Sequence, residues 1–407
     1  MNKYLDNTSP AKITAEIHIS GSKSESNRAL ILQKLFPQIH IENLSDSDDT
    51  QHLQNALHSE KETIDIGHAG TAMRFLTAYF ATLEGKTMFL TGSERMQERP
   101  IQILVEALRD LGADIAYMNR EGYPPLKITG KKLTQNKVSL DANISSQYIS
   151  ALLLIAPSLE KGLQITLKGH LTSIPYIQMT LALLNQIGVQ TTFIDQIIQV
   201  QPLKKSSQII QNEPDWSSAS YFYSWVALHG NSSILLKGFK ANSLQGDHVV
   251  AEIYKSFGVE TIFSNAGIYI QKNAQESSVK PNNSSIVLNL NHAPDIAQTI
   301  AVTCLGLGIK AHLTGLHTLK IKETDRLAAL KTELEKLGAK VEITEDSLTL
   351  TTPKSLNQNT IIATYNDHRM AMAFAPLSSI IPLQIENPEV VTKSYKLFWE
   401  DWNKLIC

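Results

Sequence analysis

The sequence of 407 residues has only two cysteines, Cys304 and Cys407, and a formal net charge of only -2. Two cysteines provide neither a disulfide framework nor the spacing of a metal-binding motif. A charge so close to zero argues against binding to nucleic acid or to a membrane through bulk charge. The longest apolar run, around residues 149–157, is too short to cross a bilayer, and the first ten residues are too polar for a secretory signal. We therefore expect a cytoplasmic protein, and we expect no metal or other cofactor.

Arginine is also scarce, since it provides only 8 of the 37 basic residues. Six of the eight lie in dense polar strings at or near predicted helix starts: Arg28, Arg74, Arg95, Arg99, Arg326 and Arg369. The planar guanidinium binds a carboxylate or a phosphate through two parallel hydrogen bonds, which lysine cannot do. This placement indicates that arginine is used where geometry matters, as in the recognition of an anion.

The chain is long for a single core, so two domains are expected. Four predicted amphipathic helices end in the same way, each with a glycine that is followed by a strand pattern. These segments are residues 103–112, 180–188, 250–258 and 330–338. Their final glycines lie 76, 70 and 80 residues apart. That period is too long for a solenoid, but it suits a folding unit of several strands and two helices.

A second set of helices is apolar on nearly every side, which predicts that these helices are buried. They cover residues 29–35, 72–83, 148–156, 219–228, 296–307 and 370–377. Six buried helices alternating with amphipathic ones predict about six copies of one unit, three per domain. A polar string precedes each buried helix. If the helices run parallel within a domain, their positive N-terminal ends meet on one face that suits an anionic ligand.

The stretch Gly21–Arg28 shows this arrangement most clearly. It follows an alternating strand pattern and precedes a helix that Ser24 or Ser26 can cap. Glycine, hydroxyl groups and Lys23 at a helix N-terminus form a candidate anion site, although an ordinary capped helix explains the stretch equally well. A Walker A loop is excluded because Ser22, not glycine, precedes Lys23.

Other polar strings also stand at predicted helix starts. Gly70 serves either a close approach to a ligand or a tight turn. Pro100 is expected at the N1 position of a helix, which would hold Arg99 at the helix start. Asp215 and Asp295 each precede a buried helix, where aspartate is most often an N-cap. The remaining strings are Ser145–Gln147, Lys322–Arg326 and Tyr365–Met372. A charge run is usually a solvated face, but His and Arg that lead into an apolar helix would be costly if they were unpaired.

Six of these strings resemble, in order, those of the 3-phosphoshikimate 1-carboxyvinyltransferase family, also called 5-enolpyruvylshikimate-3-phosphate synthases. They are Gly-Ser-Lys-Ser-Glu-Ser-Asn-Arg, Ala-Gly-Thr-Ala-Met-Arg, Arg-Met-Gln-Glu-Arg-Pro, Ser-Ser-Gln, Lys-Glu-Thr-Asp-Arg-Leu and Tyr-Asn-Asp-His-Arg-Met-Ala-Met. The resemblance implies an α/β fold of two lobes, a two-lobed inverse α/β barrel of six βαβαββ repeats with three per lobe, and an active site in the cleft between the lobes. It assigns residues 1–20 and 214–407 to the C-terminal lobe and residues 21–213 to the N-terminal lobe.

The family transfers the enolpyruvyl group of phosphoenolpyruvate to the 5-hydroxyl of shikimate 3-phosphate and releases phosphate, in the pathway to chorismate and the aromatic amino acids. By resemblance, Asp295 is the base and Glu323 is the proton donor and then acceptor, while Lys23, His368 and Lys393 complete the catalytic set. The shikimate 3-phosphate residues implied are Lys23, Ser24, Arg28, Ser145, Ser146, Gln147, Ser173, Asp295, Thr318 and Lys322. Those implied for phosphoenolpyruvate are Lys23, Gly70, Arg99, Gln147, Arg326, Arg369 and Lys393. The resemblance also implies a monomer and a target of glyphosate, which mimics phosphoenolpyruvate.

The chain departs from the family pattern at four positions. Ser20 replaces a usual proline, His68 replaces Asn or Asp, Phe75 replaces a proline of some members, and Thr318 replaces a substrate-binding Asn with a shorter side chain. Two alternatives are also open. The sister enzyme that acts on a UDP-linked amino sugar usually carries a loop cysteine, which neither cysteine here matches. A non-catalytic relative that binds phosphorylated ligands would be expected to have lost Asp295, Glu323 or Lys393, and all three are present.

Overall fold

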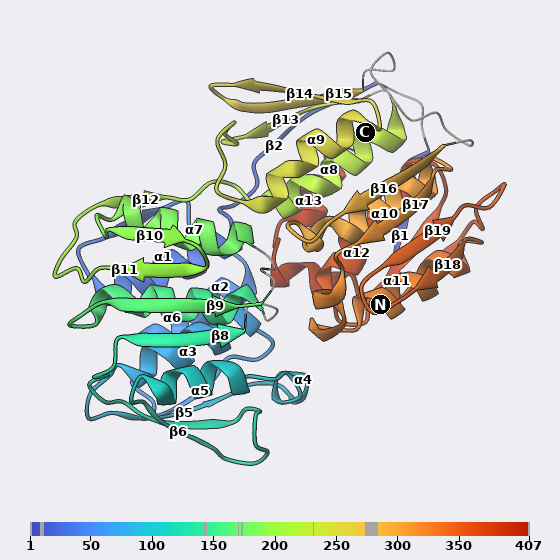
Figure 1. The fold of residues 1–407 in the computed structure, drawn as a ribbon. Helices are drawn as coiled ribbons and strands as arrows, with labels where there is room; N and C mark the ends of the chain where they lie inside the picture. The colour runs from blue at the N-terminus through green and yellow to red at the C-terminus, as the bar shows by residue number, and fades with distance from the viewer. Residues whose placement is uncertain are drawn as a thin grey trace. The chain divides into compact units, whose positions relative to one another are not determined.

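The computed structural model describes residues 2–8, 12–141, 145–169, 171, 174–230, 232–272 and 284–405. The chain divides into two compact units (Figure 1), which we call unit A (Gly21–Asn212) and unit B (Met1–Ser20 with Glu213–Cys407). Both units combine helices and sheets, and in the described residues each contains three β-sheets. The α/β class that the sequence predicts is therefore confirmed.

Unit A contains one two-stranded and two four-stranded sheets in its described residues. Its strands are β3 (His40–Glu42), β4 (Thr63–Asp65), β5 (Thr87–Thr91), β6 (Asp114–Tyr117), β7 (Leu126–Thr129), β8 (Lys137–Asp141), β9 (Leu163–Lys168), β10 (Thr191–Ile194), β11 (Ile197–Val200) and β12 (Ile209–Gln211). Its helices are α1 (Lys23–Leu35), α2 (Asp48–His58), α3 (Gly70–Ala81), α4 (Glu94–Gln97), α5 (Gln102–Asp110), α6 (Ser146–Ile155), the short η1 (Ala156–Ser158) and α7 (Ile174–Gln186).

Unit B contains one three-stranded and two four-stranded sheets in its described residues. Its strands are β1 (Asn2–Leu5), β2 (Ile13–Ile17), β13 (Ser232–Lys237), β14 (Val259–Ser264), β15 (Gly267–Lys272), β16 (Ser285–Asn289), β17 (Lys310–Thr314), β18 (Lys340–Ile343), β19 (Leu348–Thr351), β20 (Thr360–Ile362) and β21 (Leu383–Glu386). Its helices are α8 (Trp216–His229), α9 (Val250–Lys255), α10 (Ala297–Gly306), α11 (Arg326–Lys336), α12 (His368–Phe374) and α13 (Phe398–Asn403), with the short 3₁₀ helices η2 (Gly246–Val249), η3 (Pro294–Ile296), η4 (His317–Ile321), η5 (Ala375–Ser379) and η6 (Pro388–Lys393).

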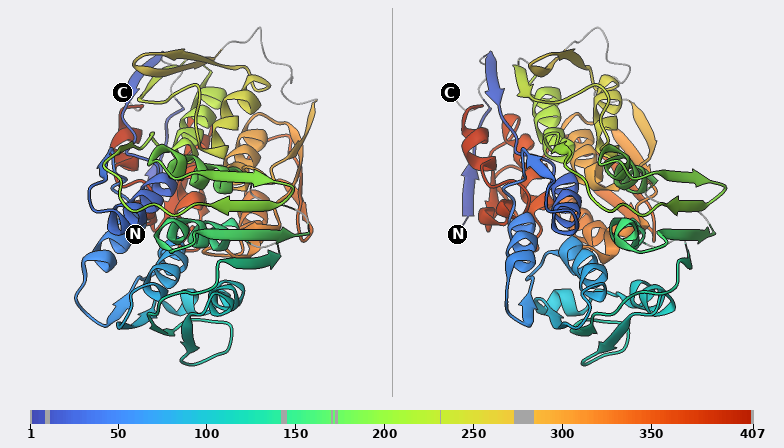
Figure 2. Two further views of the ribbon diagram at one scale, coloured as in Figure 1. Left: turned by 60° about the vertical axis from the view of Figure 1, so that its left-hand side comes forward. Right: turned by 90° about the vertical axis from the view of Figure 1, so that its left-hand side faces the viewer.

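The four-stranded sheets share one connectivity. In the sheet β4-β5-β7-β6, β4 is parallel to β5, while β7 is antiparallel to both β5 and β6. The other three repeat this order, and β2 takes the first place in the sheet with β13, β15 and β14. Strand β1 pairs antiparallel with β21, and Figure 2 shows the blue strand beside red C-terminal elements. The part of the chain that the structure describes forms six sheets, three in each unit, which confirms the predicted six repeats.

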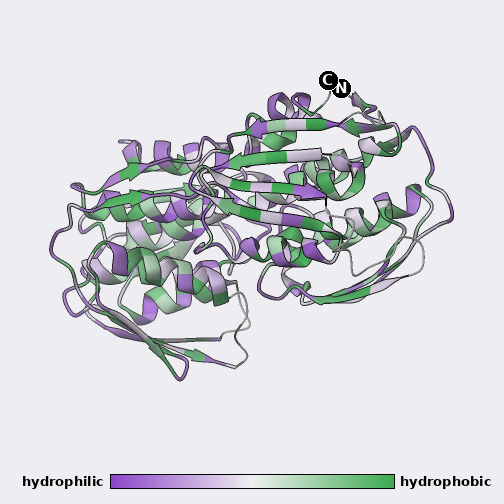
Figure 3. Cartoon of the chain, turned by 90° about the horizontal axis from the view of Figure 1, so that it is seen from above, coloured by the Kyte–Doolittle hydropathy of each residue, from purple (hydrophilic) through white to green (hydrophobic). Residues whose placement is uncertain are grey.

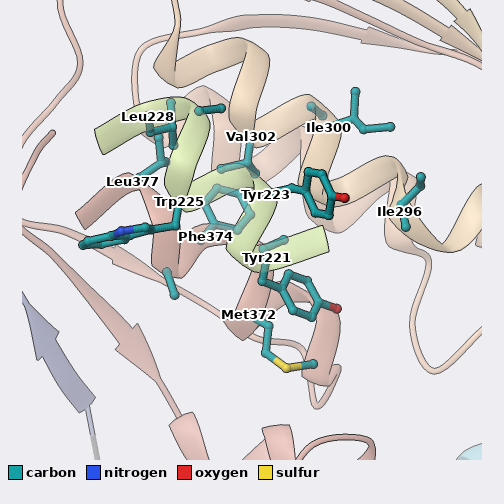
Figure 4. Close-up of a cluster of buried hydrophobic side chains, with 14 of the residues drawn as sticks. Tyr221, Tyr223, Trp225, Leu228, Ile296, Ile300, Val302, Met372, Phe374 and Leu377 are labelled. Carbon is teal, nitrogen blue, oxygen red and sulfur yellow. The ribbon is translucent and has the colours of Figure 1, made fainter. Parts of the chain in front are cut away.

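The helices that the sequence predicts to be buried form the core of each unit. Helices α1, α3 and α6 contact one another in unit A, as do α8, α10 and α12 in unit B. Figure 4 shows side chains of the unit B trio, such as Trp225, Val302 and Phe374, packed together, and all three are fully buried. Strand β13 packs against α8, and its residues alternate in burial. In β9 the buried residues are also the apolar ones, and Figure 3 shows hydrophobic and hydrophilic segments along the strands.

The glycine that ends each predicted amphipathic helix has the left-handed backbone that is typical of a helix C-terminus. The φ angles are +105° at Gly112, +95° at Gly188, +77° at Gly258 and +97° at Gly338. A strand follows each of them, as predicted. Among the described residues, no helix combines the length and the apolar character needed to cross a membrane.

Two local predictions were wrong. The N-cap of α1 is Ser22, which accepts a hydrogen bond from the amide of Glu25 at 3.5 Å, so Ser24 lies inside the first turn and cannot cap it. Ser26 also lies inside the helix, where it accepts from Ser45 and Asn212. Pro100 is not at N1, because the short α4 precedes it and the next helix begins only at Gln102.

Candidate active site

Arg326 stands at the centre of a cluster of charged side chains in unit B. It is the first residue of α11, its side chain is 2% exposed, and its guanidinium binds three carboxylates. Nε donates to Asp367 Oδ2 at 2.6 Å, Nη1 to Asp295 Oδ1 at 3.0 Å, and Nη2 to Glu323 Oε2 at 2.8 Å. Burial alone lowers the pKa of Arg326, but attraction by the three carboxylates outweighs burial, so its pKa lies above the ordinary value. The arginine therefore stays charged and fixes all three carboxylates.

Asp295 contacts two further cations. Its Oδ1 lies 3.5 Å from Lys322 Nζ, and its Oδ2 lies 3.1 Å from Nη2 of Arg369. The residue stands in η3, directly before α10, where the sequence predicts an N-cap. That prediction was wrong, since no side chain caps α10 and the carboxylate faces three cations instead. Charge-assisted hydrogen bonds outweigh one bond to a neutral amide, which explains the difference.

Glu323 contacts a second cation as well, because its Oε1 lies 3.7 Å from Lys393 Nζ at the end of η6. The charged residues thus joined are Asp295, Lys322, Glu323, Arg326, Asp367, Arg369 and Lys393, which we call the arginine cluster. They combine four cations with three carboxylates. Their burial makes these pairs stronger than surface pairs. Among the described residues, no group of three or more His, Cys, Asp or Glu side chains could hold a metal ion.

Helix starts position the members of the cluster. Asp325 caps α11 by accepting from the amide of Ala328, and Asp367 caps α12 by accepting from the amide of Arg369 at 2.9 Å. Asp215 caps α8, as predicted. The polar strings therefore precede helices in the structure, and the cluster gathers the N-terminal ends of α10, α11 and α12.

The remaining predicted residues of unit B lie close to the cluster. His368 is 1% exposed, and its Nδ1 lies 3.5 Å from Asp367 Oδ1. Thr318 lies in η4, which packs against η3, the turn that carries Asp295. The buried Thr318 Oγ1 has no hydrogen-bond partner within the described residues. Thr318 is therefore available for a contact that this part of the chain does not supply.

Asp247 is a neighbour of the cluster that no sequence motif indicates. It lies in η2, is 4% exposed, and accepts a hydrogen bond from Ser217 Oγ, which in turn accepts from Arg369 Nη2 at 3.4 Å. The side chain of Gln245 ties η2 to the start of α8, because it accepts from the amide of Trp216 and donates to a carbonyl group. An aspartate directly after a glycine gave no sign of this contact, since Ser217 lies 30 residues away in the sequence.

Replacing Asp247 with Asn should make the stability of the protein less dependent on pH. Burial, together with repulsion from Asp295, raises the pKa of Asp247 from 3.8 to about 7. The folded state therefore holds this proton more tightly than the unfolded state does. The stabilisation of the folded state by protonated Asp247 is fully present below pH 3.8 and is lost as the pH rises through about 7. The Tm of Asp247→Asn relative to wild type should thus increase between pH 4 and 7 and then level off.

Thermal unfolding over this pH range measures the effect. Asp110→Asn is the matched control, because it removes an exposed carboxylate from α5 in the other unit. A Tm difference that stays constant from pH 4 to 8 would contradict the raised pKa of Asp247.

In unit A, Lys23 is the first residue of α1, and its Nζ lies 3.3 Å from Asp49 Oδ2 in the first turn of α2. Ser24 follows it, and the carbonyl group of Ser24 accepts from Arg28 Nη1 at 2.8 Å. The starts of α1 and α2 therefore lie together. The motif at residues 21–28 indicates Lys23, whereas no pattern in the sequence indicates its acidic partner Asp49.

Arg28 is 2% exposed and is held by neutral groups. Its Nε donates to Thr180 Oγ1 at 2.7 Å, and its Nη2 donates to Ser150 Oγ at 3.0 Å. Burial lowers its pKa to about 10, so it remains charged at neutral pH. No carboxylate in the described residues lies within ion-pair distance of this guanidinium. Glu25 on the same helix attracts this guanidinium but forms no ion pair with it among the described residues, and a buried cation without an ion-pair partner favours the binding of an anion beside it.

Gly70, Arg99 and Gln147 meet at the starts of α3 and α6. Gly70 is the first residue of α3, and a Cβ on it would stand 2.4 Å from Arg99 Nη1, so glycine permits this close approach. Gln147 Nε2 donates at 3.2 Å to the hydroxyl of Thr71, the next residue of α3. Ser145 caps α6, and Ser146 is its first residue. Ser173 lies outside the described residues.

Comparisons with known proteins agree on one family. The family model described as EPSP synthase (3-phosphoshikimate 1-carboxyvinyltransferase) matches residues 7–61 and 53–402. A 3-phosphoshikimate 1-carboxyvinyltransferase of Bacteroides fragilis is 47% identical over 402 residues, which cover 98% of this chain and 96% of the relative. A 3-phosphoshikimate 1-carboxyvinyltransferase of Haemophilus influenzae is 39% identical over 431 residues, which cover 97% of this chain and 96% of the relative. The fold is similar to that of an EPSP synthase from Acinetobacter baumannii, with a TM-score of 0.76, 22% identity, and coverage of 99% of this chain and 98% of that one.

Proposed function

Because this chain belongs to the EPSP synthase family, we propose that it transfers the enolpyruvyl group of phosphoenolpyruvate to the 5-hydroxyl of shikimate 3-phosphate. The products are 5-enolpyruvylshikimate 3-phosphate and phosphate, on the route to chorismate and the aromatic amino acids. We also propose that it acts as a monomer in the cytoplasm, without a metal or other cofactor, since each role proposed below belongs to a side chain of this one chain.

The observation that carries the proposal is that Arg326 holds Asp295 and Glu323 on one guanidinium. Addition requires a base at the 5-hydroxyl and an acid at the methylene carbon of phosphoenolpyruvate. We assign the first role to Asp295 and the second to Glu323. In the addition, Asp295 takes the proton of the 5-hydroxyl, the 5-oxygen of shikimate 3-phosphate bonds to C2 of phosphoenolpyruvate, and Glu323 gives a proton to C3, the methylene carbon. In the elimination, the C2–O bond to phosphate breaks and Glu323 takes the proton back. Lys393, beside Glu323, and the buried His368 are proposed to assist.

The cations of both units match the charge of the substrates. Each substrate carries a phosphate and a carboxylate, or roughly -2.5 to -3 charges. In unit B, we propose that Arg326, Arg369 and Lys393 hold phosphoenolpyruvate, while Lys322, Asp295 and Thr318 contact shikimate 3-phosphate. The phosphate and carboxylate groups of the substrates would then replace protein carboxylates as partners of these cations.

The residues of unit A receive their roles in the same way. We propose that Lys23, Gly70, Arg99 and Gln147 contact phosphoenolpyruvate. The residues proposed for shikimate 3-phosphate are Lys23, Ser24, Arg28, Ser145, Ser146, Gln147 and Ser173. Arg28 supports this assignment most directly, because it is a buried charge held by neutral groups.

Phosphate release from the purified protein tests the proposal. Release is expected only when phosphoenolpyruvate and shikimate 3-phosphate are both present, and Lys23→Ala should abolish it. Lys34→Ala, at an exposed position near the end of the same helix, should leave release intact. Release from phosphoenolpyruvate alone would indicate a phosphatase. Saturable binding of shikimate 3-phosphate without release would favour a binding protein that has lost the chemistry.

Replacing Gly70 with Ala should weaken the binding of phosphoenolpyruvate more than that of shikimate 3-phosphate. The added Cβ would come within 2.4 Å of Arg99 Nη1, so the guanidinium has to move. The end of an arginine side chain moves easily, so we expect a folded enzyme whose KM for phosphoenolpyruvate rises about tenfold, as the loss of one charged hydrogen bond would cause. Steady-state kinetics with each substrate varied in turn measures the effect, and an unchanged KM would separate Gly70 from this site.

Glyphosate should inhibit the enzyme in competition with phosphoenolpyruvate, because it presents a similar anion and Gly70 is unsubstituted. Inhibition should weaken as phosphoenolpyruvate is raised, whereas raising shikimate 3-phosphate should not relieve it. Undiminished turnover in an excess of glyphosate over phosphoenolpyruvate would refute this expectation.

A further inference from the structure

Glu333 is a fully buried carboxylate outside the residues to which a role has been assigned. It lies on α11, two turns after Arg326, and is 0% exposed. A buried carboxylate is costly unless several donors satisfy it. Its Oε1 accepts from the hydroxyl of Tyr365 at 2.6 Å, and its Oε2 accepts from the backbone amide of Ala363 at 3.1 Å and from Lys336 Nζ at 2.8 Å. Two of these three donors belong to the loop that joins β20 to α12.

That loop has an unfavourable backbone. Tyr365 and Asn366 have φ angles of +53° and +55°, in the left-handed region, and neither is glycine. Asparagine tolerates this region better than tyrosine, which rarely adopts it. Such a conformation persists only where the surrounding structure holds it, and the bond from the Tyr365 hydroxyl to Glu333 provides such a restraint.

The loop leads directly into the arginine cluster. Asp367 follows Asn366 and accepts from Arg326 Nε at 2.6 Å and from the amide of Arg369 at 2.9 Å. Arg369 Nη1 then donates to the carbonyl group of Asp295 at 3.0 Å. Helix α11 therefore holds both ends of the loop, through Glu333 at Ala363 and Tyr365 and through Arg326 at Asp367.

We propose that Glu333 is a positioning residue that sets the place of Arg369 by holding the loop from Ala363 to Asp367. The inference rests on the proposed function, in which Arg369 binds phosphoenolpyruvate. Glu333 does not touch the reacting atoms. It acts through the loop backbone, so its loss should affect the binding of one substrate and leave the proton transfers in place.

The test is Glu333→Gln, which keeps the size of the side chain but presents an amide N–H₂ group to donors. The KM for phosphoenolpyruvate should rise about tenfold, while kcat and the KM for shikimate 3-phosphate change far less. Tyr365→Phe removes one of the two loop bonds and should give a smaller change in the same direction. Glu335→Gln is the matched control, because Glu335 is partly exposed on the same helix and pairs with Lys331. A folded Glu333→Gln enzyme with an unchanged KM for phosphoenolpyruvate overturns the proposal.

A second variant and a second measurement make the result decisive. If Glu333→Gln does not fold, Tyr365→Phe leaves the carboxylate with its other donors and carries the same kinetic test. Hydrogen exchange of residues 363–369 provides a readout that does not need activity: exchange should be faster in Glu333→Gln and Tyr365→Phe than in wild type or Glu335→Gln. If the wild type releases no phosphate, the proposed function fails, but exchange still reports on the loop. Unchanged exchange in both variants would show that Glu333 does not hold it.

Discussion

Replacing Glu323 with Gln should leave both substrates bound while kcat falls by about 10²- to 10⁴-fold, the range typical for the loss of a general acid–base group. In the wild type, Arg326 Nη2 donates to Glu323 Oε2 at 2.8 Å. Glutamine keeps the shape of the side chain and an oxygen that can accept this hydrogen bond. It cannot deliver a proton to the methylene carbon of phosphoenolpyruvate or take one back. The loss should therefore appear in turnover rather than in binding.

Phosphate release under saturating substrates, together with direct titration of shikimate 3-phosphate, separates these two effects. Glu335→Gln is the matched control, because it makes the same chemical change at a partly exposed site on α11. A Glu323→Gln enzyme with nearly normal kcat would exclude this residue as the proton donor. A variant that binds neither substrate would instead assign Glu323 to binding.

Replacing Arg326 with Met should destabilise the protein by about 3–5 kcal/mol, the usual loss when one partner of a buried ion pair is removed. The guanidinium is 2% exposed and binds Asp295, Glu323 and Asp367. Methionine would fill part of the space and leave Asp367, which is 0% exposed, without its charged partner. Activity should also fall below detection, because the two proposed proton-transfer groups would lose their common support.

Urea unfolding measures the stability of Arg326→Met, with Arg326→Lys and Arg120→Met as comparisons. Lysine keeps the positive charge but cannot donate to all three carboxylates in the geometry of the guanidinium. Arg326→Lys should therefore lose less stability than Arg326→Met and still lose most activity. Arg120 is exposed, and its replacement should change the free energy of unfolding little. Wild-type stability in Arg326→Met would show that the buried charges are balanced in another way.

Much of the fold follows from short-range patterns. A glycine after an amphipathic helix predicts the helix end because few other residues adopt a left-handed backbone, and Gly112 and Gly338 do so. Helices that are apolar on every side predict burial, and α8 and α10 are buried almost throughout. These properties depend on neighbouring residues only, so the sequence is sufficient to predict them.

The wrong and missing predictions concern contacts between residues that lie far apart in the sequence. Asp295 looks like an N-cap from its neighbours, but its partners Arg326 and Arg369 lie 31 and 74 residues further along the chain. The contact of Ser217 with Asp247 and that of Glu333 with Tyr365 likewise join separate elements. Local propensity cannot register such pairs, because they depend on how the elements pack. Six of the residues of unit B that the family resemblance named share the arginine cluster, and Thr318 and His368 lie beside it. Asp247 and Glu333 lie outside the quoted strings, so no motif revealed them.

The pairing of β1 with β21 has a consequence for the order in which the protein is made. Asn2 is paired with Glu386, and Ile13 with Ser232, so β1 and β2 each pair with a strand that is translated only after the whole of unit A. Unit A, by contrast, draws its strands only from residues that have been translated by Asn212. It can therefore fold during translation, while β2 waits for β13 (Ser232–Lys237) and β1 waits for β21 (Leu383–Glu386). Closing so long a loop is entropically costly and slow, so the nascent unit B exposes unpaired strand edges until these partner strands have been translated.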